Sequence, residues 1–227
     1  MATYTWTPPL PVPSNWGTAT NWSPNGVPTI ADTVLFSSAN NTECIVAANA
    51  NAQTLNFQDY AGILTINTNT VPIPTLTPFN LTVAGNVTLS TNPSFQLKSD
   101  ANNLGTLVIS ANSTVTSNGR TIDARLRLST INTTILLADT LTLGRALIIQ
   151  GTPSGYIYLG STVPTTQRSL ILLNNGITDQ DIDYADVSDI NGNAGVTIWN
   201  YSGVLNNCNN WIIMTKQAVP TSGFAIS

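Results

Sequence analysis

The chain has 227 residues, a formal net charge of -4 and only 8% charged residues, far below the roughly 25% of an average soluble domain. Its seven Lys and Arg residues are scattered singly, so they form no basic patch of the kind that nucleic acids or anionic membranes require. The sequence has no histidine, which removes the commonest general base and the commonest metal ligand.

The first 28 residues are predicted to form an extended N-terminal arm. Four prolines between residues 8 and 13 disfavour a helix and suit extended backbone. Three tryptophans, Trp6, Trp16 and Trp22, lie around these prolines. An exposed arm rarely carries so much aromatic surface, so we expect the three side chains to pack on something. Two alternatives are open: they cover the open end of the protein's own core, or they dock on a partner chain.

Residues 29–214 are predicted to form a single all-β body. Short apolar runs recur along it, each bounded by Asn, Thr, Ser or Gly. They are too short and too rich in β-branched residues for helices, and many alternate apolar with polar residues, as strands with one buried face do. The clearest runs are 81–83, 87–89, 95–97, 107–109, 126–128, 135–137, 141–143, 147–149, 156–159 and 170–173.

Two architectures fit these runs. A parallel β-solenoid stacks coils of three short strands, bent into one another at Asn, Gly or Ser. A β-sandwich or jelly roll instead joins antiparallel strands by hairpins. The shortness of the runs, the Asn and Thr between them and the scarcity of charge at strand edges favour the solenoid. Four Asn-Gly pairs, at 25–26, 118–119, 175–176 and 191–192, are hairpin signals and keep the sandwich open.

Two segments carry a resemblance to a known class of proteins. In residues 21–36, an Asn-Trp pair, a Val-Pro pair and Asp32 precede an apolar strand; in residues 206–213, an Asn-rich run precedes Trp211 and two isoleucines. These segments resemble the first and last coils of right-handed parallel β-helix surface proteins, among them phage tailspike-like and decoration proteins and bacterial adhesin passengers. The resemblance implies a right-handed β-helix and a homotrimer docked on a larger particle.

The candidate site for chemistry is an acidic stretch in residues 179–189. In a strand, Asp179, Asp181 and Asp183 would project from one face while Ile182 and Tyr184 point into the core. Aligned carboxylates could bind Ca²⁺, and clustered aspartates also act as acid and base in β-helix glycoside hydrolases. The stretch lacks the calcium-loop spacing with a closing Glu, which favours a simpler interpretation, a solvated strand face. No other metal or cofactor is expected.

Two arginines and two cysteines lead to further specific predictions. Arg125 and Arg127 are expected on one face of a strand, paired with Asp123 or with a carboxylate of a neighbouring chain. Cys44 and Cys208 lie near opposite ends of the sequence, and a long solenoid would keep them apart, so we expect two unpaired thiols.

The function predicted from these features is that of a non-enzymatic structural protein. A nearly uncharged Asn- and Thr-rich surface over stacked strands gives a rod whose backbone hydrogen bonds are satisfied from coil to coil. Such a rod suits a capsid decoration, spike or fibre protein on the virion surface, docked through residues 1–28 on a capsid or tail protein. Residues 215–227 are expected to be a tail that packs on a partner.

Two other functions stay open at this point. One is a bacterial cell-surface adhesin that binds glycans, and the other is a polysaccharide depolymerase of the β-helix type. No signal peptide is visible in residues 1–20, which favours assembly inside a host over export. No apolar run approaches the ~20 residues of a membrane span, so we expect no membrane partner.

Overall fold

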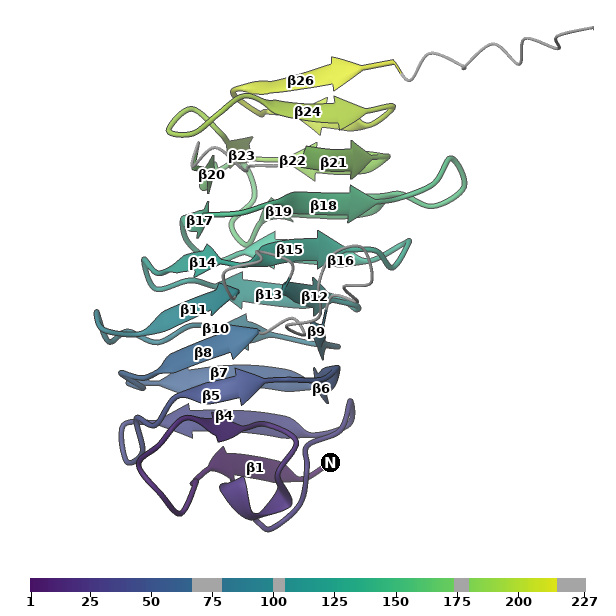
Figure 1. Cartoon of the computed structure of the whole chain (residues 1–227). Coiled ribbons are helices and arrows are strands. Elements are labelled where there is room, and N and C mark those ends of the chain that lie inside the picture. The colour runs from purple at the N-terminus through teal and green to yellow at the C-terminus, as the bar shows by residue number, and fades with distance from the viewer. Residues whose placement is uncertain (67–78, 100–104, 174–179, 216–227) are drawn as a thin grey trace, which may run out of the picture.

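The protein is a column of short strands stacked one above another, from β1 at the purple end to β26 at the yellow end (Figure 1). The computed structural model describes residues 1–66, 79–99, 105–173 and 180–215. Within them the one helical segment is a short 3-10 turn, η1 (Ala19–Asn21). It does not approach the length and hydrophobicity that a helix needs to cross a membrane. The prediction of an all-β chain is confirmed.

The strands form three sheets. The first sheet has the order β3 (Trp22–Ser23), β1 (Thr3–Trp6), β4 (Thr33–Ser37), β7 (Thr54–Gln58), β10 (Val87–Thr88), β13 (Ser113–Thr116), β16 (Thr134–Leu137), β19 (Ile157–Ser161), β22 (Ala185–Ser188) and β25 (Val204–Asn206). The second has the order β2 (Ser14–Asn15), β5 (Cys44–Val46), β8 (Ile63–Ile66), β11 (Gln96–Ser99), β14 (Thr121–Asp123), β17 (Leu141–Leu143), β20 (Arg168–Leu172) and β23 (Ile190–Asn191). The third has the order β6 (Ala50–Ala52), β9 (Asn80–Val83), β12 (Thr106–Ile109), β15 (Arg125–Leu128), β18 (Leu147–Gln150), β21 (Gln180–Asp183), β24 (Ile198–Tyr201) and β26 (Trp211–Met214).

Apart from β1 and β3, the neighbouring strands within each sheet are parallel, and most lie three strands apart along the chain. The chain therefore visits the three sheets in turn and returns one level higher, as β9, β12 and β15 do. Among the named strands of the described residues, only β1 and β3 pair antiparallel. Long parallel sheets of this kind are consistent with a β-solenoid, and they do not fit a sandwich built from hairpins.

The Asn-Gly pair at 118–119 shows why the hairpin signal was misleading. Asn118 and Gly119 both have positive φ, 51° and 73°, as a tight turn requires. The turn joins β13 to β14, which lie in different sheets, so it bends the chain around a corner of the coil instead of reversing it. The pair at 175–176 lies outside the described residues.

The core is a set of apolar columns that run along the stack. In the third sheet, one column places residues of five successive strands in register, and each of them is at most 1% exposed: Val83, Ile109, Leu128, Ile149 and Ile182. Burial of one such side chain contributes about 1.5–3 kcal/mol to folding. Alternate residues point outward, so a three- or four-residue strand suffices to fill one level of the core.

Asparagine side chains fasten one coil to the next at the corners. The Oδ1 atoms of Asn49, Asn86 and Asn112 accept hydrogen bonds from backbone N–H groups 31, 28 and 22 residues further on, at 3.0, 2.8 and 2.8 Å. These distances along the chain correspond to one coil. The Asn-rich connections therefore satisfy backbone donors that the short strands leave unpaired.

Two strands within the predicted N-terminal arm pair with strands of the body. β1 pairs in parallel with β4, from Thr3 beside Thr33 to Thr5 beside Leu35, and β2 pairs with β5. The prolines at 8–13 lie in the connection between β1 and β2, where the sheet requires no backbone N–H. Residues 3–6 are thus the first level of the stack, and the division into arm, body and tail at residues 28 and 214 stays a prediction.

Candidate functional site

The three N-terminal tryptophans form an aromatic cluster at the start of the column. Trp6, Trp16 and Trp22 are at most 2% exposed. The ring of Trp22 stands edge-on to the other two, with centroids 4.9 Å away in each case, and all three rings lie near Phe36 of β4. The aromatic core continues upward through Phe57, which stacks on Phe36 with centroids 4.7 Å apart.

Hydrogen bonds orient two of these indoles. Nε1 of Trp22 donates to the carbonyl oxygen of Trp16 at 2.7 Å, and Nε1 of Trp6 donates to that of Thr42 at 2.9 Å. Tyr60 also donates to the carbonyl of Thr42, and its burial raises the pKa of its hydroxyl well above the usual value. The tryptophans therefore lie where the core-covering alternative predicts, and docking of the N-terminal segment on a partner stays a prediction.

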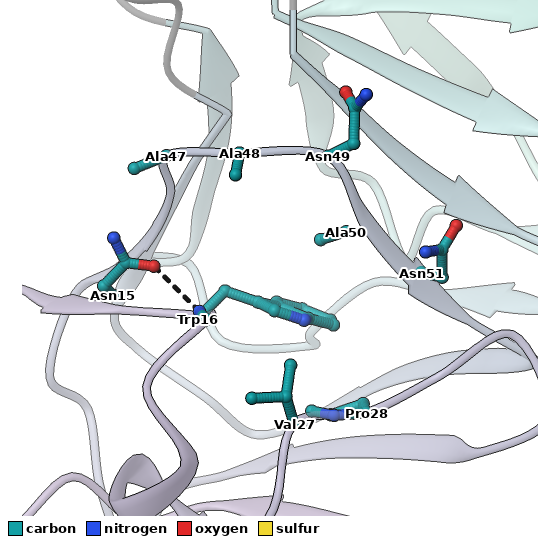
Figure 2. A pocket seen from close by; sticks show the side chains of 10 residues that line it. Asn15, Trp16, Val27, Pro28, Ala47, Ala48, Asn49, Ala50 and Asn51 are labelled. Atoms are coloured by element: carbon teal, nitrogen blue, oxygen red, sulfur yellow. Dashed lines mark hydrogen bonds between the residues drawn. The ribbon is translucent and has the colours of Figure 1, made fainter.

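The remaining indole, that of Trp16, borders a small pocket of about 130 Å³. Residues Ala47, Ala48 and Asn49 run along one side of the ring, and Val27 and Pro28 lie on the other (Figure 2). Nε1 of Trp16 is buried and has no hydrogen-bond partner among the described residues. Because one water occupies ~30 Å³, the pocket has room for a few waters or one small side chain.

The outward side of the N-terminal end carries apolar groups that the sequence analysis did not single out. Leu10 and Val12 are 62% and 51% exposed, and Val27 and Ile30 are also exposed. An open hollow of about 530 Å³ lies between residues 8–11 and 39–42. Residues 1–31 contain no Asp, Glu, Lys or Arg. In the sequence, Leu10 and Val12 alternate with Pro9, Pro11 and Pro13, and this pattern indicates an extended segment with apolar side chains on one side.

Asp32 joins the first strand to the first complete coil. Its Oδ1 accepts from the N–H of Ala2 at 2.9 Å, and its Oδ2 accepts from the hydroxyl and the N–H of Thr29 at 2.6 and 3.0 Å. These hydrogen bonds, the one from the Thr29 hydroxyl foremost, hold the pKa of Asp32 below its usual value. Asp32, the aspartate of the N-terminal motif, therefore stabilises the first level of the stack by binding the start of the chain at Ala2 and the turn at Thr29.

The predicted calcium ligands lie only partly within the described residues. Asp181 and Asp183 alternate with the buried Ile182 on β21, as expected, whereas Asp179 lies outside the described residues. The prediction that Tyr184 points into the core is wrong. Its φ of 50° places it at the corner between β21 and β22, half-buried, with its ring edge-on to that of Tyr156 at 5.9 Å.

Asp181 belongs to a ladder of polar side chains on the outer face of the third sheet. Nη2 of Arg127 donates to Oε1 of Gln150 at 2.6 Å, and Nε2 of Gln150 donates to Oδ2 of Asp181 at 3.0 Å. Among the described residues, no three Asp, Glu or Cys side chains gather as a metal ion would require. The solvated strand face favoured by the sequence, and calcium binding by Asp179, Asp181 and Asp183 as its alternative, therefore both stay predictions.

The partner of Asp123 is a different arginine from those expected. Nε of Arg145, one coil further on, lies 2.8 Å from Oδ1 of Asp123. Arg125 and Arg127 project from β15, and Arg127 bonds to Gln150 instead. Since the Asp123 carboxylate is 43% exposed, this ion pair contributes at most ~1 kcal/mol to stability.

Both cysteines are free, as predicted. Cys44 is buried in β5, and this burial, together with the charge of Glu43, raises the pKa of its thiol. Cys208 is half-buried, and burial raises its pKa as well. A buried thiol with a raised pKa is a poor nucleophile, because the thiolate is the reactive form.

Comparisons of this chain with family models, with curated proteins and with solved structures find no match.

Proposed function

We propose that this protein is a structural component of the outer surface of a virus particle, as a capsid decoration, spike or fibre protein. It docks by its N-terminal end on a capsid or tail protein and projects its column of coils outward. The observation that supports this most is the character of the N-terminal end: a sealed aromatic core on the inside, and uncharged, exposed Leu10 and Val12 beside an open hollow on the outside.

The fold proposed for the column is a right-handed parallel β-helix. Connections between parallel strands of one sheet are right-handed in nearly all proteins. The resemblance of residues 21–36 and 206–213 to the first and last coils of β-helix surface proteins supports the same fold, and by that resemblance the working form is a homotrimer. A stack whose backbone groups bond from coil to coil resists proteolysis, which suits a component exposed outside a particle.

In this proposal the partner binds a proline-rich segment, residues 8–14, that hydrogen bonds hold in one conformation. The carbonyl of Pro8 accepts a hydrogen bond from Nδ2 of Asn40 at 3.3 Å, and the carbonyl of Val12 accepts one from Oγ of Ser14 at 2.9 Å. The segment between them presents Leu10 and Val12 outward with three prolines nearby, so little conformational entropy is lost on binding. In this proposal Trp6, Trp16 and Trp22 hold the docking segment in shape from beneath.

Immunogold electron microscopy of the native source tests the assignment. Antibody against the folded protein is expected to label virus particles at regular positions. Label on the cell envelope with none on particles would contradict the proposal and promote the bacterial adhesin. Release of oligosaccharides from a host polysaccharide by the purified protein would instead favour the depolymerase.

The docking segment has its own test once particles are in hand. The double variant Leu10→Asp, Val12→Asp is expected to fold normally and to lose at least tenfold in incorporation, because two charges would be buried against the partner. Val163→Asp is the matched control, since Val163 is 44% exposed in the loop after β19. Equal incorporation of both variants would show that docking uses another surface.

A further inference from the structure

Among the described residues, the C-terminal end of the column leaves core positions uncovered. Trp211 and Ile213 of β26 lie in register with Ile198 and Asn200 of β24, both fully buried. Ile213 is therefore on the inward side of its strand, yet it is 48% exposed, because no described strand lies beyond β26 in the third sheet. In the first sheet, Leu205 of β25 likewise continues the inward position of Val187 and is only half-buried.

The outward positions at this end are also apolar. Trp199 pairs in register with Ile212, and Tyr201 pairs with Met214. Trp199, Ile212 and Met214 are each more than a third exposed, as is Val204 at the edge of the first sheet. Apolar side chains thus surround the last strand on both of its faces, which is unusual for a surface in contact with water alone.

Within residues 190–215, the edge strand β26 lacks the devices by which proteins protect the edges of their sheets, although the neighbouring edge strands β23 and β25 have only two and three residues. Such devices are charged side chains, prolines and very short edge strands. Residues 190–215 contain no Asp, Glu, Lys, Arg or Pro, and the edge strand β26 is four residues long. At the opposite end the first 28 residues contain six prolines, the edge strands β2, β3 and β6 have two, two and three residues, and the tryptophans cover the core.

We infer that the C-terminal ends of two copies of this chain pair end to end around a twofold axis. In such a contact β26 adds to β26 of the partner as an antiparallel strand of equal length, and the uncovered core positions meet. A surface that meets its own copy also meets its own charges, and residues 190–215 carry none, so this part of the end can self-associate without electrostatic repulsion. The protected N-terminal end is a poor partner for this edge, so the contact closes instead of growing into a filament.

Sedimentation velocity on the full chain, from about 1 to 100 µM, tests this inference. Ile213→Lys is expected to halve the mass of the assembly, because the ammonium group would be buried in the contact without a partner. Ile212→Lys is a second variant on the outward face of β26, and Val163→Lys is the control at an exposed site away from the end. If copies also associate side by side, for example as the proposed trimer, Ile213→Lys is expected to halve the mass of that larger assembly in the same way.

Hydrogen exchange locates the contact. Amides of β25 and β26 are expected to become more protected as the concentration rises, while those of β1 to β3 do not change. Three results would overturn the inference: a monomeric wild-type chain at 100 µM, an assembly that Ile213→Lys leaves intact, or protection of β26 that is independent of concentration. Protection of β26 that does not depend on concentration would mean that residues 216–227 of the same chain, and not a second copy, cover its edge. None of these results bears on where the N-terminal end docks, so the inference and the proposed function can fail separately.

Discussion

The carboxylate of Asp32 shows how one residue can hold the entrance to a repetitive fold. Its pKa is lowered by hydrogen bonds from Thr29 and Ala2, so the folded protein binds its proton less readily than the unfolded chain does. The resulting stabilisation is full above the unfolded pKa of ~3.9 and is lost as the pH falls through the folded value. We therefore expect Asp32→Asn to lower the melting temperature at pH 7 but not at the lowest pH at which the wild type still folds. Circular dichroism melts across pH test this, with Asp186→Asn on the outward face of β22 as the control. A pH-independent difference would contradict the linkage.

The tryptophans give a second prediction at the scale of single residues. Trp22 contacts Trp6, Trp16 and Phe36, so truncating it opens a cavity in the middle of the cap. We expect Trp22→Ala to cost about 3–5 kcal/mol of the free energy of unfolding, measured with urea. Val163→Ala is the control, because that side chain is 44% exposed and lies away from the C-terminal end, and it should cost less than ~1 kcal/mol. Equal losses would mean that the cap contributes little to stability.

At the scale of strands and corners, the distance between coils is set by close backbone contacts. A Cβ atom added to Gly105 would lie 2.1 Å from the carbonyl oxygen of Ile66, which ends β8 in the coil below. The neighbouring atom is backbone and cannot rotate away, so we expect Gly105→Ala to cost ~3 kcal/mol, at the upper end of the usual range for overpacking. At Gly119 an added Cβ would meet nothing within 4 Å, and only the positive φ of 73° opposes it. Gly119→Ala should therefore cost ~1–2 kcal/mol. Urea unfolding of both variants compares them, and the reverse order would show that the coils can move apart at β8.

The outer face of β21 gives a prediction about calcium. Gln150 already donates to one carboxylate oxygen of Asp181, and two carboxylates alone supply fewer than the 6–8 oxygen ligands that Ca²⁺ takes. We expect 5 mM CaCl₂ to leave the melting temperature unchanged in the wild type and in Asp181→Asn. A rise of several degrees in the wild type that is lost in both Asp181→Asn and Asp183→Asn would establish a calcium site.

Sequence patterns predicted the strands better than the ends of the column. Runs such as 107–109 and 126–128 became β12 and β15, because alternation and β-branching act locally. β6 (Ala50–Ala52) was missed, since its inward residues are small alanines in a polar surrounding. The role of Trp22 could not be decided from the sequence. Covering a core and docking on a partner both require apolar side chains, and only the contact with Phe36, 14 positions away, distinguishes them. The exposure of Leu10 and Val12 could not be predicted either, because an apolar residue in a short segment can face the core or the solvent.

For the whole molecule, the contrast between a sealed and an open end predicts different effects of truncation. Strands of each sheet contact the levels directly above and below, so the stability of the column is close to a sum over neighbouring coils. We expect a chain ending at residue 173, which loses β21 to β26, to keep the β-sheet circular dichroism signal and the amide protection of β4 to β14.

A chain that begins at residue 29 loses β1, β2, β3 and all three cap tryptophans, which exposes Phe36 and the edge of β4. It should aggregate or lose protection in β4 and β7 first, since an unprotected edge next to exposed aromatic surface favours association. Hydrogen exchange of the two truncated chains at equal concentration decides the question. If the chain from residue 29 is the more protected in β4 and β7, the tryptophan cap is dispensable for folding and free to serve a partner.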